Sequence, residues 1–231
     1  MIPHPMPTVF IPALLCDAEL YRDVIATLGN SVEAQVMLSP KPRLEDSVAD
    51  ILARAPARFA LVGTSYGGSL ALEVALAASE RVTALWLMGC DPGSPQTGGP
   101  NLAGDLNTTP AAVIDMLAAL VVHKHATSAR DTFIAMARRV GGSDGAAQAR
   151  ALSARSAVTP QLEKLNMPTL LLWGEEDSLV PVSVGQAMAD ALPNAHFHKL
   201  AGCGHLPTLE KPSKAATFFK EFMQAEAARA D

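Results

Sequence analysis

Short apolar runs alternate along this chain with longer segments in which apolar residues return every three to four positions. The second pattern is that of an amphipathic helix, and the first is typical of buried strands. Apolar runs predict strands at residues 8–11, 58–62, 82–88 and 169–173, alternation predicts one at residues 32–38, and a last strand is predicted at residues 195–200. The periodic segments predict helices at residues 18–28, 44–55, 66–78, 182–192 and 213–228. We therefore expect an α/β fold, with a mainly parallel sheet of about six strands covered by helices on both faces.

The alternation stops between residues 91 and 167, where no strand is predicted. Glycine and proline are frequent up to Pro110, and helical patterns follow. The helix opened by Thr109-Pro110 carries apolar residues at helical spacing: Val113, Met116, Leu117, Leu120 and Val121. Two more helices are predicted at residues 128–140 and 145–157, with a break at Gly141-Gly142. We interpret residues 91–167 as a helical lid inserted into a core domain of residues 1–90 and 168–231. The alternative is a long crossover made of ordinary core helices.

Ser65 is the centre of a Gly-x-Ser-x-Gly sequence, Gly63 to Gly67, between a predicted strand and a predicted helix. In that order the five residues form a sharp turn that exposes the serine hydroxyl as a nucleophile. Glycine is needed two positions to either side because neighbouring backbone approaches too closely for a Cβ. The start of the helix adds free N–H groups that favour negative charge on a bound substrate. The alternative is a chance match in a loop, which the flanking strand and helix disfavour.

A nucleophilic serine needs a base within hydrogen-bond reach, and the base needs a third group that fixes its tautomer. Of the six histidines, His205 is the candidate base because it lies in a loop just after the last predicted strand. The carboxyl ends of parallel strands share one edge of a sheet, so we expect His205 and Ser65 at the same edge. Asp177 follows the strand at residues 169–173 and is the candidate acid by the same argument.

Asp91 is the competing acid, since it follows the strand predicted beside the serine turn. Its other role would be to cap the turn at Pro92-Gly93. Glu175 and Glu176 are interpreted as solvated surface charge. The remaining histidines are expected in a strand, on the lid or in the amino-terminal tail: His196, His198, His123, His125 and His4.

The composition excludes several classes of protein. At 231 residues, with 49% hydrophobic and 18% charged residues, the chain is expected to form one domain, with or without an insertion. The net charge of −5 and the lack of a long basic run argue against nucleic-acid binding. No apolar stretch has membrane-spanning length, and residues 1–7 do not resemble a signal peptide. The three cysteines, Cys16, Cys90 and Cys203, are expected as reduced thiols of a cytoplasmic protein.

Four segments together resemble the α/β-hydrolase superfamily, close to its small esterase-like branch with pimeloyl-carrier-protein methyl-esterase relatives. They are Val9–Asp17, Gly63–Gly68, Pro168–Pro181 and Gly202–Pro212. The chain order Ser65, Asp177, His205 is also the one expected of that superfamily. The resemblance is specific for the fold and the triad, covers both ends of the chain, and says little about the substrate.

The resemblance further implies an oxyanion hole made by two backbone N–H groups, those of Leu14 and Tyr66. The family's usual His-Gly pair after the first strand is replaced here by Pro12-Ala13. Backbone donors tolerate a change of side chain, so Leu14 is still expected to serve as a donor.

These residues predict a serine hydrolase that cleaves a small-molecule carboxylic ester through an acyl-enzyme, with no metal or organic cofactor. Thioester hydrolysis and carbon–carbon bond hydrolysis remain alternatives because the same triad serves all three, and a ligand-binding homologue without turnover is a fourth reading. A monomer or a homodimer is expected.

Five lid residues would line an apolar substrate pocket if they face the site: Val113, Met116, Leu117, Leu120 and Phe133. Their alternative role is packing between the lid and the body.

Overall fold

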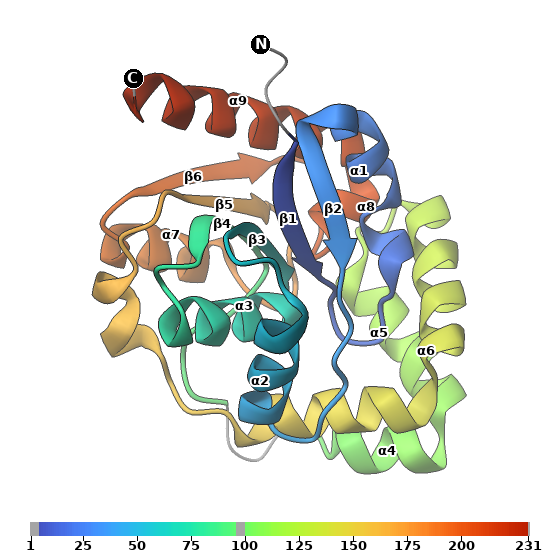
Figure 1. Cartoon of the computed structure of the whole chain (residues 1–231). Helices are drawn as coiled ribbons and strands as arrows, with labels where there is room; N and C mark the ends of the chain where they lie inside the picture. The colour runs from blue at the N-terminus through green and yellow to red at the C-terminus, as the bar shows by residue number, and fades with distance from the viewer. Residues whose placement is uncertain (1–4, 96–99, 231) are drawn as a thin grey trace.

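The centre of the protein is a sheet of six parallel strands. The computed structural model describes residues 5–95 and 100–230. The strands are β1 (Met6–Ile11), β2 (Val32–Val36), β3 (Phe59–Thr64), β4 (Val82–Met88), β5 (Thr169–Gly174) and β6 (Ala195–Leu200). Their order in the sheet is β2-β1-β3-β4-β5-β6, and every neighbouring pair is parallel (Figure 1). The predicted fold class is confirmed, and all six predicted strands are present.

Helices cover both faces of this sheet. On one face lie α1 (Arg22–Leu28), the short α8 (Pro207–Glu210) and α9 (Pro212–Ala230), and on the other lie α2 (Leu44–Arg54), α3 (Tyr66–Ala77) and α7 (Val182–Ala191) (Figure 1). Three 3₁₀ segments join these elements: Ala18–Leu20, Gly29–Ser31 and Thr159–Lys164. The helix predicted at residues 18–28 is therefore divided into a 3₁₀ turn, capped by Asp17, and α1.

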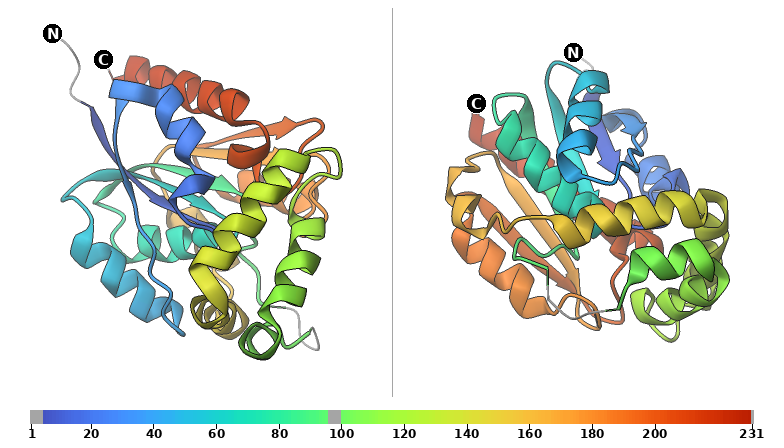
Figure 2. Two further views of the ribbon diagram at one scale, coloured as in Figure 1. Left: turned by 90° about the vertical axis from the view of Figure 1, so that its right-hand side faces the viewer. Right: turned by 90° about the horizontal axis from the view of Figure 1, so that it is seen from below.

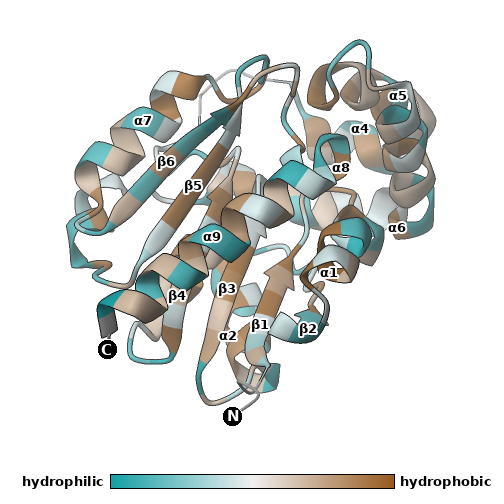
Figure 3. Cartoon of the chain, turned by 90° about the horizontal axis from the view of Figure 1, so that it is seen from above, coloured by the Kyte–Doolittle hydropathy of each residue, from teal (hydrophilic) through white to brown (hydrophobic). Residues whose placement is uncertain are grey.

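Successive strand residues point to opposite faces, which divides the core in two. Phe10 packs on the side of α1 and α9, whereas Val9 and Ile11 pack on the side of α2 and α3. The same alternation holds in β3, where Val62 belongs to the first core and Leu61 to the second. Figure 3 shows the inner strands coloured mostly as apolar residues, whereas the edge strands β2 and β6 also carry polar ones. A strand that is apolar on both faces is stable only between two layers of helices, and this is the arrangement that the sequence predicted.

The helices between β4 and β5 lie together near the carboxyl ends of the strands (Figures 1 and 2). They are α4 (Leu102–Thr108), α5 (Pro110–Val121) and α6 (Thr127–Ala154). Gly141 has φ 80° and ψ 167°, so α6 is two helical segments that meet at the predicted glycine break. The sequence predicted no helix before Thr109, and this was wrong for α4. Asn101 caps α4 by accepting a hydrogen bond from the N–H of Gly104.

The inner side chains of these three helices continue one of the two cores. Leu106, Leu117 and Met136 belong to the same apolar cluster as Phe10 and Trp86. The interpretation of residues 91–167 as a separate lid domain stays a prediction. Within the part of the chain that the structure describes, no helix is both long enough and apolar enough to cross a lipid bilayer.

The first turn of α3 lies directly against the end of β1. A methyl group added at Gly67 would overlap the carbonyl oxygens of Ile11 and Pro12, and one at Gly63 would meet the backbone of Gly67. These are backbone atoms that cannot rotate away, so glycine is required at both positions. The close approach brings the residues after β1 next to the residues after β3.

We expect Gly67→Ala to lower the free energy of unfolding by about 2–3 kcal/mol, because the added methyl group overpacks two backbone carbonyls. Urea denaturation measures this change. Gly29→Ala measures backbone strain alone: Gly29 has φ 54° and no atom lies within 4 Å of its added methyl group, so only a strain of about 1–3 kcal/mol applies. A loss below about 1 kcal/mol in Gly67→Ala would contradict the close approach.

Candidate active site

Ser65 occupies the sharp turn between β3 and α3. Its φ of 54° and ψ of −117° lie in a region that residues with a side chain rarely adopt, at a cost of about 1–3 kcal/mol. The Ser65 N–H donates to the carbonyl oxygen of Met88, the last residue of β4, over 2.8 Å. The turn therefore continues from the sheet itself and fixes the serine at the carboxyl end of β3.

Tyr21 joins the ends of two neighbouring strands beneath this turn. Its buried hydroxyl donates to the carbonyl oxygen of Ile11 and lies 2.8 Å from the hydroxyl oxygen of Thr64, the residue before Ser65. Burial raises the pKa of Tyr21 well above its ordinary value, so the hydroxyl stays neutral. The sequence analysis did not identify Tyr21, because its role arises from a contact between residues distant in the chain.

His205 and Asp177 form a buried pair. His205 Nδ1 is 2.7 Å from Asp177 Oδ2, and the two side chains are 2% and 1% exposed. The other carboxylate oxygen of Asp177 accepts the N–H groups of Leu179 and Val180, each over 2.9 Å. Because an ionised carboxylate supplies only acceptors, the neutral tautomer that fits this contact carries its proton on Nδ1 and leaves Nε2 as the acceptor.

Asp91, the competing acid, lies elsewhere. Its Oδ1 accepts the N–H of Gly93 over 2.8 Å, which is the turn-capping role considered as its alternative. The structure pairs His205 with Asp177 and not with Asp91.

Ser65 follows β3 and His205 follows β6, and the end of β4, the strand beside β3, contacts both residues. The imidazole lies over Gly89, where an added methyl group would come within 2.9 Å of Nδ1 and Cε1. Gly89 directly follows Met88, which binds the Ser65 N–H. Among the described residues, His205 Nε2 is buried without a hydrogen-bond partner, so no hydrogen bond joins it to Ser65. A buried acceptor without a donor is costly, and it is the atom to which a serine hydroxyl would donate.

Two carboxylates hold the loop that carries His205. Glu176 accepts the N–H groups of Gly202 and Cys203, over 3.2 and 2.9 Å. These bonds, above all that from Cys203, hold the pKa of Glu176 below its usual range. Glu176 is exposed, as expected of surface charge, and it also holds this loop, a role that the sequence analysis did not assign. No local pattern marks it, because its partners lie 26 and 27 residues away.

Glu210 joins the His205 loop to the segment after α5. Its carboxylate accepts the N–H groups of Gly204 and His123 at 2.9 Å each, and that of Leu206 at 3.1 Å. The His205 N–H itself donates to the carbonyl oxygen of Val121 at the end of α5. The backbone on both sides of the candidate base is thus fixed by one side chain and one helix end. The sequence analysis assigned no role to Glu210.

The two residues expected to form the oxyanion hole lie at the turns after β1 and β3. Among the described residues, no acceptor is found for the Leu14 N–H. Tyr66 is the first residue of α3, where the N–H groups have no partner within the helix. The Tyr66 side chain extends to the carbonyl oxygen of Ser39, so only its backbone can face the serine.

The five residues predicted to line a pocket do not share one surface. Val113, Leu117 and Phe133 are 6%, 7% and 1% exposed within the core that the helices share with the sheet. Met116 and Leu120, on another face of α5, are 45% and 40% exposed. Packing between the helices and the body accounts for the first three, and the structure shows no common lining of the five.

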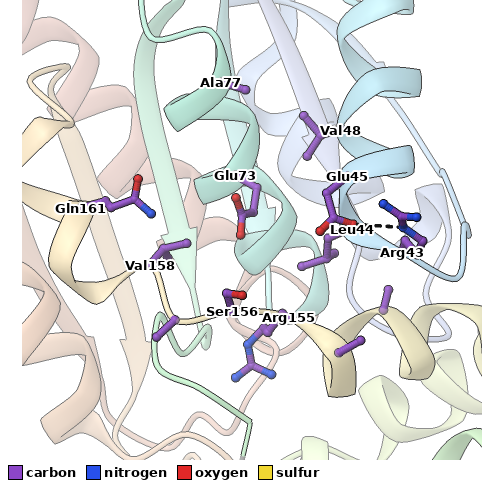
Figure 4. A pocket seen from close by; sticks show the side chains of 13 residues that line it. Arg43, Leu44, Glu45, Val48, Glu73, Ala77, Arg155, Ser156, Val158 and Gln161 are labelled. Atoms are coloured by element: carbon purple, nitrogen blue, oxygen red, sulfur yellow. Dashed lines mark ion pairs between the residues drawn. The ribbon is translucent and has the colours of Figure 1, made fainter.

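A hollow of about 690 Å³ lies between α2, α3 and the segment after α6 (Figure 4). The carboxylates of Glu45 and Glu73 extend toward it, and Arg43 is paired with Glu45. Burial and the charge of Glu45 raise the pKa of Glu73. None of Ser65, Asp177 and His205 lines this hollow, so it is separate from the candidate active site.

A parallel sheet with a strained serine after its third strand and a buried histidine–aspartate pair after its later strands defines an α/β hydrolase. The chain belongs to the alpha/beta hydrolase family, which it matches over residues 15–217.

Relatives in this family carry different names. The chain is 30% identical to the 2-hydroxymuconate semialdehyde hydrolase of a Pseudomonas species over an alignment 187 residues long, which covers 73% of this chain and 63% of that protein. It therefore spans less than two thirds of that relative.

Solved structures show the same fold at low sequence identity. An esterase from Thermogutta terrifontis superposes with a TM-score of 0.85 at 19% identity, covering 95% of this chain and 90% of that one. The enol-lactonase from Burkholderia xenovorans gives 0.84 at 19% identity, covering 96% and 92%.

We expect Glu210→Ala to loosen the His205 loop, because three backbone N–H groups lose their acceptor at once. Hydrogen exchange of the amides at residues 203–206 should accelerate, and the melting temperature should fall. Glu221→Ala, an exposed carboxylate on α9, is the control and should change neither. Unchanged exchange in Glu210→Ala would show that the loop is held by other contacts.

Proposed function

We propose that this protein is a serine esterase, in which Ser65, His205 and Asp177 transfer the acyl group of a small-molecule ester to water. The observation that carries the proposal is the buried His205–Asp177 hydrogen bond, which among the described residues leaves Nε2 without a partner on an imidazole that lies over Gly89, the residue after the Met88 carbonyl that binds the Ser65 N–H. A neutral imidazole with one ring nitrogen fixed by a carboxylate is the arrangement that a general base requires.

The first step forms a bond between Ser65 Oγ and the ester carbonyl carbon. His205 Nε2 takes the hydroxyl proton as this bond forms, and Asp177 stabilises the imidazolium. The alcohol then leaves with the proton that His205 returns. Water attacks the acyl-serine by the same steps, with His205 again as the base, and the acid product is released.

The negative charge that develops on the carbonyl oxygen needs donors that are already in place. We assign this role to the N–H groups of Leu14 and Tyr66, with Pro12-Ala13 in place of the family's usual His-Gly pair. One such donor commonly contributes about 2.7–4 kcal/mol to transition-state stabilisation. The close approach of α3 to the end of β1 supports this pairing, because it brings the two turns together.

Hydrolysis of a carbon–carbon bond is the second candidate. It is favoured by the similarity to a hydrolase named for 2-hydroxymuconate semialdehyde, since that compound contains no ester bond for water to cleave. The esterase from Thermogutta terrifontis supports the first candidate through its fold. Thioester hydrolysis uses the same triad and is separated from both by the choice of substrate.

We expect Ser65→Ala and Asp177→Asn each to lower kcat on p-nitrophenyl butyrate by about 10⁴-fold or more, because the triad acts as a unit. Initial rates and the stoichiometry of labelling by a serine-directed phosphonate measure this. Asp91→Asn is the matched control for Asp177→Asn and should retain activity, since Asp91 only caps a turn.

Full esterase turnover in Ser65→Ala would refute the mechanism. Folded wild-type protein that binds esters without turnover would instead indicate a ligand-binding homologue. Turnover of a dienol semialdehyde or an acyl-thioester well above that of esters would favour the other two reactions.

The dependence on pH tests His205 separately. The imidazole accepts the serine proton only in its neutral form, so kcat/KM should rise with pH across the range in which histidine deprotonates. Steady-state rates from pH 5 to 8 on an uncharged ester measure this. A flat profile would exclude His205 as the base.

A further inference from the structure

The turn that follows β1 contains a residue with an unusual backbone conformation. Leu15 has φ 61°, in the left-handed region that leucine rarely adopts, and it is completely buried. The N–H of the next residue, Cys16, donates to the carbonyl oxygen of Ala13 and closes a tight turn. Leu14, the expected oxyanion donor, is inside this turn, so the direction of its N–H depends on what keeps Leu15 in place.

The group that holds Leu15 comes from the helical region. The Leu15 N–H donates to Oε1 of Gln148 on α6 over 3.0 Å, across 133 residues of sequence. Gln148 is only 2% exposed, so water does not compete effectively for this bond. The Leu15 side chain also fits against α6, because a methyl group added at Gly145 would overlap its Cδ2.

A second contact joins the same helix to the same segment. Arg139, on the other side of the kink at Gly141, donates to Asp17 over 2.8 Å and also pairs with Glu19. These groups are partly exposed, so this contact is the weaker of the two. Figures 1 and 2 show α6 passing the end of β1, where both contacts are made.

From this geometry we infer that Gln148 is a positioning residue for the oxyanion hole: its side-chain oxygen fixes the Leu14–Leu15 peptide and, through the turn closed by Ala13 and Cys16, the adjoining peptide whose Leu14 N–H faces the ester oxygen. This rests on the proposed function. Gln148 is neutral and binds the N–H of Leu15, not that of Leu14, so it orients the donor without placing charge near the oxyanion. The proton transfers of Ser65 and His205 do not involve it.

Gln148→Met tests this role, because methionine is unbranched and similar in length but lacks the acceptor. We expect kcat on p-nitrophenyl butyrate to fall by about 10- to 100-fold with KM changed less than about twofold, since a misaligned donor weakens only the transition state. Affinity for a trifluoromethyl ketone, which forms an oxyanion on the serine, should fall by a similar factor. The pH profile should keep its midpoint, because the triad is unaltered.

Gln148→Glu keeps an acceptor oxygen at the same place but brings a buried negative charge near the oxyanion, so it should recover only part of the kcat that Gln148→Met loses. Gln186→Met, the same substitution on the exposed surface of α7, controls for the change of residue type. If Gln148→Met does not fold, Gln148→Asn, which shortens the same amide, is measured in the same way and should also lose kcat.

Wild-type kcat and wild-type ketone affinity in folded Gln148→Met would overturn the inference, even if its melting temperature changed. Loss of activity with a shifted pH profile would overturn it too, since the defect would then lie in the triad. Ser65→Ala separates failure of this inference from failure of the proposed function. If Ser65→Ala keeps wild-type turnover, the esterase mechanism and the role of Gln148 are both refuted. If Ser65→Ala loses turnover but Gln148→Met does not, only the role of Gln148 is refuted.

Discussion

The hydrogen bond between His205 and Asp177 joins two loops and is shielded from solvent, because the two side chains are 2% and 1% exposed. Both side chains are buried, and breaking such a pair by removing one partner typically costs about 3–5 kcal/mol, because the other partner stays behind unpaired. The surrounding backbone is arranged to make this burial tolerable. Two N–H groups solvate the far oxygen of Asp177, and Glu176 and Glu210 bind the loop that presents His205. The site therefore depends on one ion-like pair and on the backbone bonds that fix its two loops.

A second constraint is the close contact between the turn after β1 and the first turn of α3. Gly67 permits it, and Tyr21 ties the ends of β1 and β3 together below it. The same contact imposes strain, since Ser65 and Leu15 both have positive φ. Such backbone conformations persist only where the surrounding contacts contribute more free energy than the strain costs. Ser65 is fixed by the sheet, and Leu15 by α6.

Much of the fold was predictable because its signals are local. The four inner strands are short apolar runs, β2 is an alternating segment, and the break at Gly141 follows from glycine. The candidate triad was predictable from topology, because parallel strands end at a common edge. Tyr21, Glu176, Glu210 and Gln148 were not, since each acts on backbone groups distant in sequence, and no spacing rule describes a side chain that binds a remote N–H group. Helix α4 was missed for another reason: glycine and proline around it outweigh its few apolar residues, and its cap at Asn101 was overlooked.

The predicted pocket shows how the helices between β4 and β5 relate to the site. An amphipathic pattern identifies which side of α5 is buried, but it does not identify the residues against which that side packs. In the structure these are residues of the apolar core that the helices share with the sheet. Three polar contacts attach these helices to the loops of the site: Val121 to His205, His123 to Glu210, and Gln148 to Leu15. Lifting the helices away would leave these groups unpaired, at a cost of about 1–3 kcal/mol for each one that stays buried. These contacts oppose movement of the helices away from the site. Under the proposed function, the shape of the surface they form near Ser65 would select among esters, thioesters and carbon–carbon bonds.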